Sequence, residues 1–130
     1  LDRERAERCL RLHTMIRRRQ TDSAGQTVET AKEYIRQHYA ESDLSVEKLC
    51  AYLHLSSTYF STLFKRETGT SFTAYVTTVR MEAAAEAIRS TEEKTYLIAQ
   101  RCGYEDPNYF SYVFKRHFGV TPTKYRSEGK

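Results

Sequence analysis

The sequence has few of the residues that interrupt helices, and it has no long apolar stretch. Its 130 residues include only 5 glycines and 2 prolines, which disfavours a disordered tail or a turn-rich all-β sandwich. The longest uninterrupted apolar run spans residues 49–53, far short of the roughly 20 residues that a membrane-spanning helix needs. The length allows one ordinary domain or two very small ones and excludes a barrel enzyme. We therefore expect a helical globular domain that does not enter a membrane.

Cysteine is also scarce, and the common catalytic motifs are absent. Cys9, Cys50 and Cys102 cannot all pair, and the last two fall in apolar helical patterns, as free thiols in a reducing cytoplasm often do. Nothing within the 130 residues resembles a secretory signal, in line with that expectation. The sequence contains no G-x-S-x-G motif, no Gly-rich phosphate loop and no H-E-x-x-H motif, so we expect neither catalysis nor a cofactor. Cys50 and His54 have a spacing that suits two metal ligands, but without a second pair a packed thiol is favoured over a metal site.

The charge is mildly basic and unevenly distributed. The chain holds 21 Lys and Arg against 17 Asp and Glu, a net charge of +4, which permits a polyanionic partner without demanding one. Residues 1–26 hold seven arginines against four acidic residues, a net charge of +3, which leaves only +1 for the remainder. If the remainder binds a polyanion, the placement of its charges must matter more than their sum.

The first 26 residues are predicted to be a connector. Apolar residues recur at three- and four-residue steps along a short helix that ends in three arginines, and residues 21–26 form a polar linker. We expect the helix to join a missing upstream domain, since the sequence starts at Leu1 rather than at methionine; a nucleic-acid or membrane-surface arm is the alternative. The helix also has a short heptad seam, marginal for dimerisation, so the isolated chain is expected to be monomeric. The seam consists of Ala6, Cys9, His13 and Ile16.

From residue 27 onward, helix signals follow one another regularly. One helix carries Val28, Ala31, Tyr34, Ile35 and Tyr39 on one side. Three serines then precede three apolar periodic segments as N-caps: a helix over about 46–52, a helix that ends at a C-terminal glycine, and a longer helix to about residue 90. The long helix is nearly 30 Å in length and carries Phe72, Tyr75 or Val76, Val79, Ala83 and Ala87 as its apolar stripe. The three caps are Ser45, Ser56 and Ser71, and the glycine is Gly69.

The pattern then repeats at an offset of fifty residues. Each copy is a short helix, a tight turn and a second helix. In the second copy Gly103 forms the turn, Asp106 and Pro107 open the second helix, and Thr121 begins a short final helix. Eight identities are in register: Tyr59, Phe60, Ser61, Phe64, Lys65, Arg66, Gly69 and Tyr75 correspond to Tyr109, Phe110, Ser111, Phe114, Lys115, Arg116, Gly119 and Tyr125.

Two helix-turn-helix units joined by a rigid helix suggest a reader of DNA. The second helix of such a unit enters the major groove, and successive grooves on one face of the duplex are about 34 Å apart. The apolar stripes predict which side chains point outward. They are Ser57, Thr58, Ser61, Thr62 and Lys65 in the first copy, and Asn108, Ser111, Tyr112 and Lys115 in the second. Short polar side chains can bond base edges, and the basic residues Lys65, Arg66, Lys115 and Arg116 suit phosphates.

These residues resemble a known family. SSTYFSTLFKRETGTSFTAYV (residues 56–76) and GYEDPNYFSYVFKRHFGVTPTKYR (residues 103–126) are similar to the two halves of an AraC/XylS-type DNA-binding domain. The resemblance covers residues 27–127. It implies an all-α domain of seven helices, with homeodomain-like units over 27–69 and 95–127 and a linker helix over 71–90 around Arg80. The family comprises bacterial transcription regulators, often activators that contact RNA polymerase, and this chain is most similar to the C-terminal half of two-component response regulators.

The resemblance also assigns roles at the protein–DNA interface. It implies base reading by Thr58, Ser61 and Thr62 in the first unit and by Asn108, Ser111 and Tyr112 in the second. Ser57 joins the four basic residues as a phosphate contact. An arginine often occupies the positions of Thr62 and Tyr112, so we expect a target with less guanine at those positions.

The alternative function is a helical protein-interaction module without base-specific binding, since the chain has 10 tyrosines and 6 phenylalanines. Most of these aromatics have helical spacing and apolar neighbours, which favours core packing, whereas Tyr112 lies off the apolar stripe. The expected core aromatics are Tyr34, Phe60, Phe64, Phe72, Phe110, Phe114 and Phe118.

Overall fold

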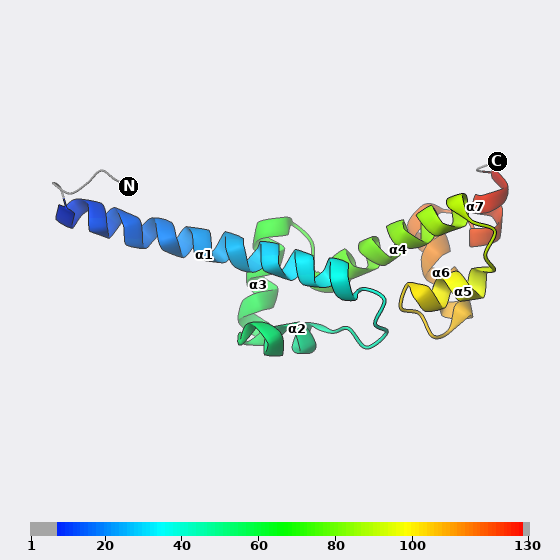
Figure 1. The fold of residues 1–130 in the computed structure, drawn as a ribbon, viewed down its shortest axis with the longest axis horizontal. Coiled ribbons are helices and arrows are strands. Elements are labelled where there is room, and N and C mark those ends of the chain that lie inside the picture. The colour runs from blue at the N-terminus through cyan, green and yellow to red at the C-terminus, as the bar shows by residue number, and fades with distance from the viewer. Residues whose placement is uncertain (1–7, 129–130) are drawn as a thin grey trace.

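Seven α-helices and no strand make up the part of the chain that the structure, a computed structural model, describes: residues 8–128, with side chains from residue 23 onward. The helices are α1 (Arg8–His38), α2 (Val46–Leu53), α3 (Ser57–Thr68), α4 (Phe72–Ser90), α5 (Thr95–Arg101), α6 (Pro107–Phe118) and α7 (Pro122–Glu128). Figure 1 shows two groups of helices, α1–α3 and α5–α7, at opposite ends of α4. This arrangement confirms the predicted all-α class and the linker helix. None of the described helices is long and apolar enough to cross a membrane.

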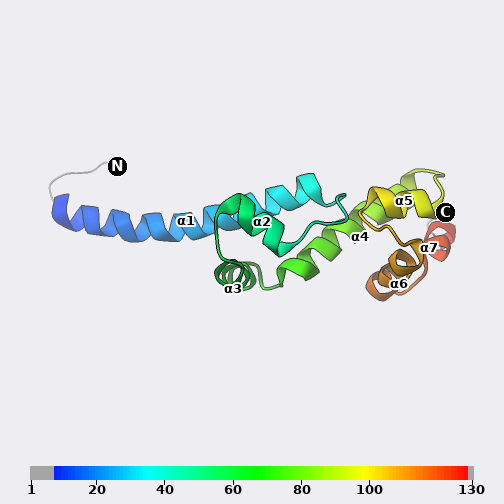
Figure 2. The same cartoon turned by 90° about the horizontal axis from the view of Figure 1, so that it is seen from below.

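The polar linker predicted over residues 21–26 is wrong, because α1 continues through it. Ala24 packs against the first core and Val28 is buried in it, so this turn of the helix has a buried face. Thr27 Oγ1 also donates a hydrogen bond to the Ser23 carbonyl at 2.8 Å. Tertiary packing thus outweighs the weak helix propensity of the segment. The N-terminal part of α1 projects beyond the first unit in both views (Figures 1 and 2). The predicted seam from Ala6 to Ile16 lies outside the described side chains.

The predicted caps fix where the helices begin and end. Ser45, Ser56 and Ser71 each accept a hydrogen bond from the backbone N–H three residues later at 3.1 Å. Asp106 accepts one from the N–H of Asn108 at 2.9 Å, with Pro107 in the first turn of α6. The glycines after α3 and α6 adopt positive φ, as expected of C-terminal glycines. The two second helices of the repeat therefore start and stop at matching positions.

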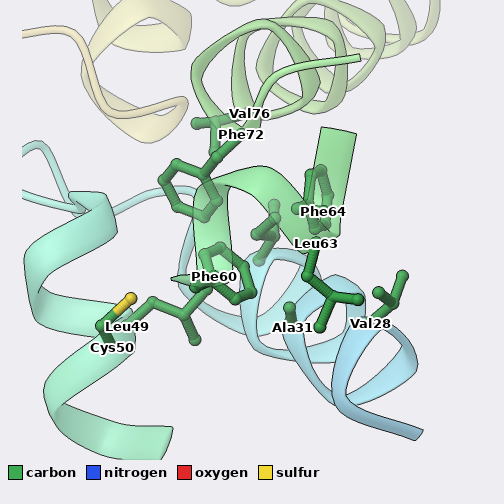
Figure 3. Packing of buried hydrophobic residues seen from close by; sticks show 10 residues of the cluster. Val28, Ala31, Leu49, Cys50, Phe60, Leu63, Phe64, Phe72 and Val76 are labelled. Carbon is green, nitrogen blue, oxygen red and sulfur yellow. The ribbon is translucent and has the colours of Figure 1, made fainter. Parts of the chain in front are cut away.

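Each unit has its own apolar core. The first is built from α1, α2, α3 and the start of α4, and Figure 3 shows side chains of these helices converging on it. The second is built from α4, α5 and α6. The first comprises Val28, Ala31, Ile35, Leu49, Cys50, Phe60, Leu63, Phe64, Phe72 and Val76. The second comprises Met81, Ala84, Ala85, Ile88, Ile98, Ala99, Cys102, Tyr104, Phe110 and Phe114.

The apolar stripe predicted along α4 is only half right. Phe72 and Val76 enter the first core, but Ala83 and Ala87 are only partly buried. The residues that α4 buries in the second core are Met81, Ala84, Ala85 and Ile88. The stripe changes phase because α4 turns one face to the first unit and another to the second. Five of the seven expected core aromatics are buried, whereas Tyr34 and Phe118 are partly buried.

Candidate nucleic-acid interface

The outward face of α3 carries the residues that the sequence predicted. Phe60, Leu63 and Phe64 are buried against the first core, with α1 and α2 packed on that side of the helix. The opposite side consequently faces solvent. Thr58, Ser61, Thr62 and Lys65 are exposed, and Ser57 is half-buried at the first turn.

The outward face of α6 matches that of α3. Phe110 and Phe114 are fully buried, and Val113, also expected to point inward, is partly buried. Asn108, Tyr112 and Lys115 are exposed, and Ser111 is half-buried. Both helices therefore present the predicted side chains at equivalent positions of the repeat. The short polar residues lie in the first turns and the basic residues in the last turn.

Tyr112 is held in a small exposed stack rather than packed in the core. The residue is 57% exposed, and its ring stacks on that of Tyr109, with the ring centroids 6.2 Å apart and the planes inclined by 28°. The Arg116 guanidinium carbon lies 5.8 Å from the centroid of the Tyr112 ring, which is a cation–π geometry. Tyr112 is thus partly preorganised on the outward face, consistent with its predicted place off the apolar stripe.

Two further exposed aromatic residues, one on α3 and one on α6, were not singled out from the sequence. Tyr59 and Tyr109 occupy the same repeat position and are 55% and 56% exposed. In the sequence they stand out only as one of the eight identical pairs of the repeat. Each directly precedes a buried phenylalanine, so a helical projection would have placed it beside the apolar stripe rather than within it.

The basic residues at the ends of α3 and α6 are accessible to an external anion. Lys65 and Lys115 are exposed, and neither has an ion pair with any other described residue. Arg66 pairs with the neighbouring Glu67 at 3.4 Å, in an exposed contact that competes weakly with a phosphate. Four positive charges are therefore displayed beside the polar faces, although the net charge of the chain is small.

The cysteine positions have the features of packing residues. Cys50 is buried, its thiol donates to the Ser56 carbonyl at 3.8 Å, and burial raises the pKa of this thiol. Burial likewise raises the pKa of the Cys102 thiol in the second core. His54 is exposed and ends α2 in a left-handed conformation with φ of 60°. No group of three or more His, Cys, Asp or Glu residues positioned to hold a metal ion occurs among the described residues.

Comparisons with known proteins agree with this geometry. A family model described as a helix-turn-helix domain matches residues 49–128. The curated sequence of YisR, an HTH-type transcriptional regulator of Bacillus subtilis, is 35% identical over 118 residues, covering 90% of this chain and 41% of YisR. The chain thus spans less than half of that relative's length.

Solved structures show the same fold. The C-terminal domain of AraT, a response regulator from Geobacillus stearothermophilus, is 42% identical with a TM-score of 0.78, over 78% of this chain and 84% of that one. The DNA-binding domain of the transcription factor AdpA, solved with a target DNA, is 25% identical with a TM-score of 0.73, over 78% of this chain and 90% of that one. The chain therefore belongs to the AraC-type family of helix-turn-helix regulators, which are DNA-binding transcription regulators and not enzymes.

Proposed function

We propose that residues 27–127 are the DNA-binding domain of a bacterial transcription activator, which reads two adjacent major-groove segments with α3 and α6. The observation that carries this proposal is the register-matched pair of exposed faces. Thr58 and Asn108, Ser61 and Ser111, and Thr62 and Tyr112 occupy equivalent positions, each pair fifty residues apart. All six side chains are polar and five of them are exposed, with Ser111 half-buried, and a structural role alone gives no reason for two helices to share this pattern.

The side-chain chemistry supports a division of roles within each face. Asn108 can bond an adenine through two hydrogen bonds, and the hydroxyl groups of Thr58, Ser61, Thr62 and Ser111 can donate to or accept from base edges. Tyr112 offers a hydroxyl group and a ring edge. Lys65, Arg66, Lys115 and Arg116, with the hydroxyl group of Ser57, would bind phosphates and so orient the protein without reading sequence.

The length of α4 suits two neighbouring segments. Its 19 residues extend over about 28 Å at 1.5 Å per residue, close to the 34 Å between successive major grooves on one face of the duplex. The structural similarity to AdpA, which was solved with a target DNA, supports the same use of the fold here.

For the whole protein, we propose an upstream receiver domain controlled by phosphorylation, joined through residues 1–26. The similarity to AraT, named a response regulator, supports a receiver over a small-molecule sensor. RNA polymerase is the proposed protein partner, and the cytoplasm, where both polymerase and DNA reside, is the proposed location. We expect the isolated chain to be monomeric and the full-length protein to dimerise, which sedimentation of both at several concentrations would test.

Selection of random duplex DNA by the purified chain tests the central proposal. We expect enrichment of two short blocks about ten base pairs apart, because one helical turn separates the two grooves. A salt titration of the selected duplex against a scrambled one should leave a preference for the selected duplex at every salt concentration. Weak binding without enrichment, lost as the salt concentration rises, would instead favour the alternative of a protein-interaction module.

A further inference from the structure

Arg80 lies at the middle of α4, between the two cores, and its guanidinium group binds the turn that follows α1. Its Nε donates a hydrogen bond to the Tyr39 carbonyl at 2.9 Å, and its Nη2 donates one to the Glu41 carbonyl at 2.8 Å. Hydrogen bonds from a charged donor are stronger than neutral ones. This turn follows α1 of the first helix-turn-helix unit, and the Tyr39 side chain packs against the second core, so the guanidinium group is anchored where the two units meet.

The same guanidinium group also contacts the second unit. Its carbon lies 5.3 Å from the ring centroid of Tyr104, whose side chain is buried in the second core. Burial in this core is the main reason why the pKa of Tyr104 is raised. Arg80 thus bridges the two units through a carbonyl pair on one side and an aromatic face on the other.

The turns of the two units also approach each other directly around Arg80. A Cβ atom at Gly103 would lie 2.6 Å from the Tyr39 carbonyl oxygen and 3.0 Å from the Arg80 guanidinium carbon, so only glycine fits. Nearby, the Ser42 hydroxyl group donates to the Glu105 carboxylate at 2.8 Å. We call the group formed by Arg80, Tyr39, Glu41, Gly103 and Tyr104 the central contact.

The central contact constrains a motion that α4 alone would allow. Long helices bend, and α3 and α6 belong to different units at opposite ends of α4. Bending or twisting of α4 would change the angle and distance between the two recognition helices. A contact at the middle of α4 that joins both units opposes such changes.

We propose that Arg80 is a positioning residue that fixes α6 relative to α3 and thereby sets the spacing between the two DNA segments that the protein accepts. The proposal rests on the proposed function, in which both helices read DNA. It depends on the shape of the guanidinium group, not only on its charge. A planar fork reaches two carbonyls and an aromatic face at once, whereas a lysine ammonium group at this position cannot.

The test compares duplexes that differ only in the spacing of the two selected blocks. Inserting or deleting one base pair rotates one block by about 34° and moves it by about 3.4 Å. We expect the affinity of the unaltered chain to fall by about tenfold or more, because a rigid linkage contributes only when both sites are engaged together. Duplexes that keep one block and scramble the other measure each recognition helix by itself.

In Arg80→Met and Arg80→Lys we expect a changed spacing to lower the affinity by only about threefold or less. Affinity for the best spacing should fall by about tenfold, and affinity for single blocks should stay within about twofold of that of the unaltered chain. Arg80→Lys keeps the positive charge, so a shared effect of both variants excludes a simple loss of attraction to DNA. Helical circular dichroism and thermal unfolding establish that each variant is folded.

Gly103→Ala disturbs the central contact without changing Arg80, because its added Cβ would clash with the Tyr39 carbonyl oxygen. This variant therefore tests the proposal even if the Arg80 variants fail to fold. Its matched control is Gly119→Ala, because Gly119 has a similar φ of +85° but no atom within 4 Å of an added Cβ. We expect relaxed spacing in Gly103→Ala and unchanged spacing in Gly119→Ala.

The outcomes separate this inference from the proposed function. If the unaltered chain selects no pair of blocks, the proposed function fails and the inference fails with it. If the unaltered chain requires one spacing and the folded Arg80 and Gly103 variants require it equally, only the inference is overturned. An equal loss on every duplex, single blocks included, would also overturn it, because a positioning residue acts only where both blocks are bound.

Discussion

Lys115→Ala would remove one positive charge from the exposed last turn of α6, where the lysine has no ion pair with a described residue. If Lys65, Arg66, Lys115 and Arg116 each neutralise one phosphate, the plot of log affinity against log salt has a slope of about −3.6. The variant should have a slope of about −2.7. Between 50 and 200 mM salt the unaltered chain would then lose about 150-fold in affinity and the variant about 40-fold.

Asn108→Ala should behave differently, because it removes a base contact and no charge. Asn108 is exposed in the first turn of α6, where its backbone N–H is already bonded to Asp106 and its side chain is left for an outside partner. Loss of a two-bond adenine contact costs about 1–3 kcal/mol, or about 5- to 150-fold, on the selected duplex. The scrambled duplex should be bound almost as before, with an unchanged salt slope.

Fluorescence anisotropy with both duplexes at several salt concentrations measures these quantities directly. Lys32→Ala is the matched control, because Lys32 pairs with Glu29 at 3.5 Å on α1, the helix that packs on the buried side of α3. Its salt slope should equal that of the unaltered chain. Equal losses on the selected and scrambled duplexes for both Lys115→Ala and Asn108→Ala would refute the division into phosphate and base contacts.

Three further predictions concern the fold that presents these faces. Phe110→Ala should lower the free energy of unfolding by about 3–5 kcal/mol in urea titrations, because the ring is fully buried; a cost below 1 kcal/mol would contradict the described core. Asp106→Ala should cost about 1 kcal/mol in the same assay, through loss of the cap at the start of α6. The hydrogen bond from His38 lowers the pKa of Glu41, followed in effect by that from Lys48. A lowered carboxyl pKa stabilises the fold above the unfolded-state value of about 4.3 and loses that effect as the pH falls through the folded-state value. Glu41→Gln should therefore flatten the decline of thermal stability in this acid range, and an unchanged decline would show that the contact does not contribute.

The local signals of the sequence predicted most of the fold. Ser45, Ser56, Ser71 and Asp106 act on N–H groups two or three residues away, so their roles can be read without knowledge of the fold. The faces of α3 and α6 were also predictable, because the buried phenylalanines at helical spacing define the opposite side.

Features that depend on distant contacts were not predictable. The helix through residues 21–26 is stabilised because Ala24 packs against, and Val28 is buried in, a core that forms only in the folded chain. The contacts of Arg80 join residues about forty positions apart in the sequence, and an arginine on a helix otherwise looks like a solvated charge. The preorganised stack of Tyr109 and Tyr112 likewise requires the positions of side chains.

Because α4 contributes side chains to both cores, it couples the unfolding of the two units. Phe72 and Val76 belong to the first core and Met81 and Ile88 to the second, so neither unit can unfold without exposing part of the same helix. Local unfolding follows such cooperative units. Amide hydrogens at the middle of α4 should then exchange with solvent only when both units open, and more slowly than those of α2 or α7. We therefore expect the slowest hydrogen exchange of the described residues in the helix that links the two helix-turn-helix units.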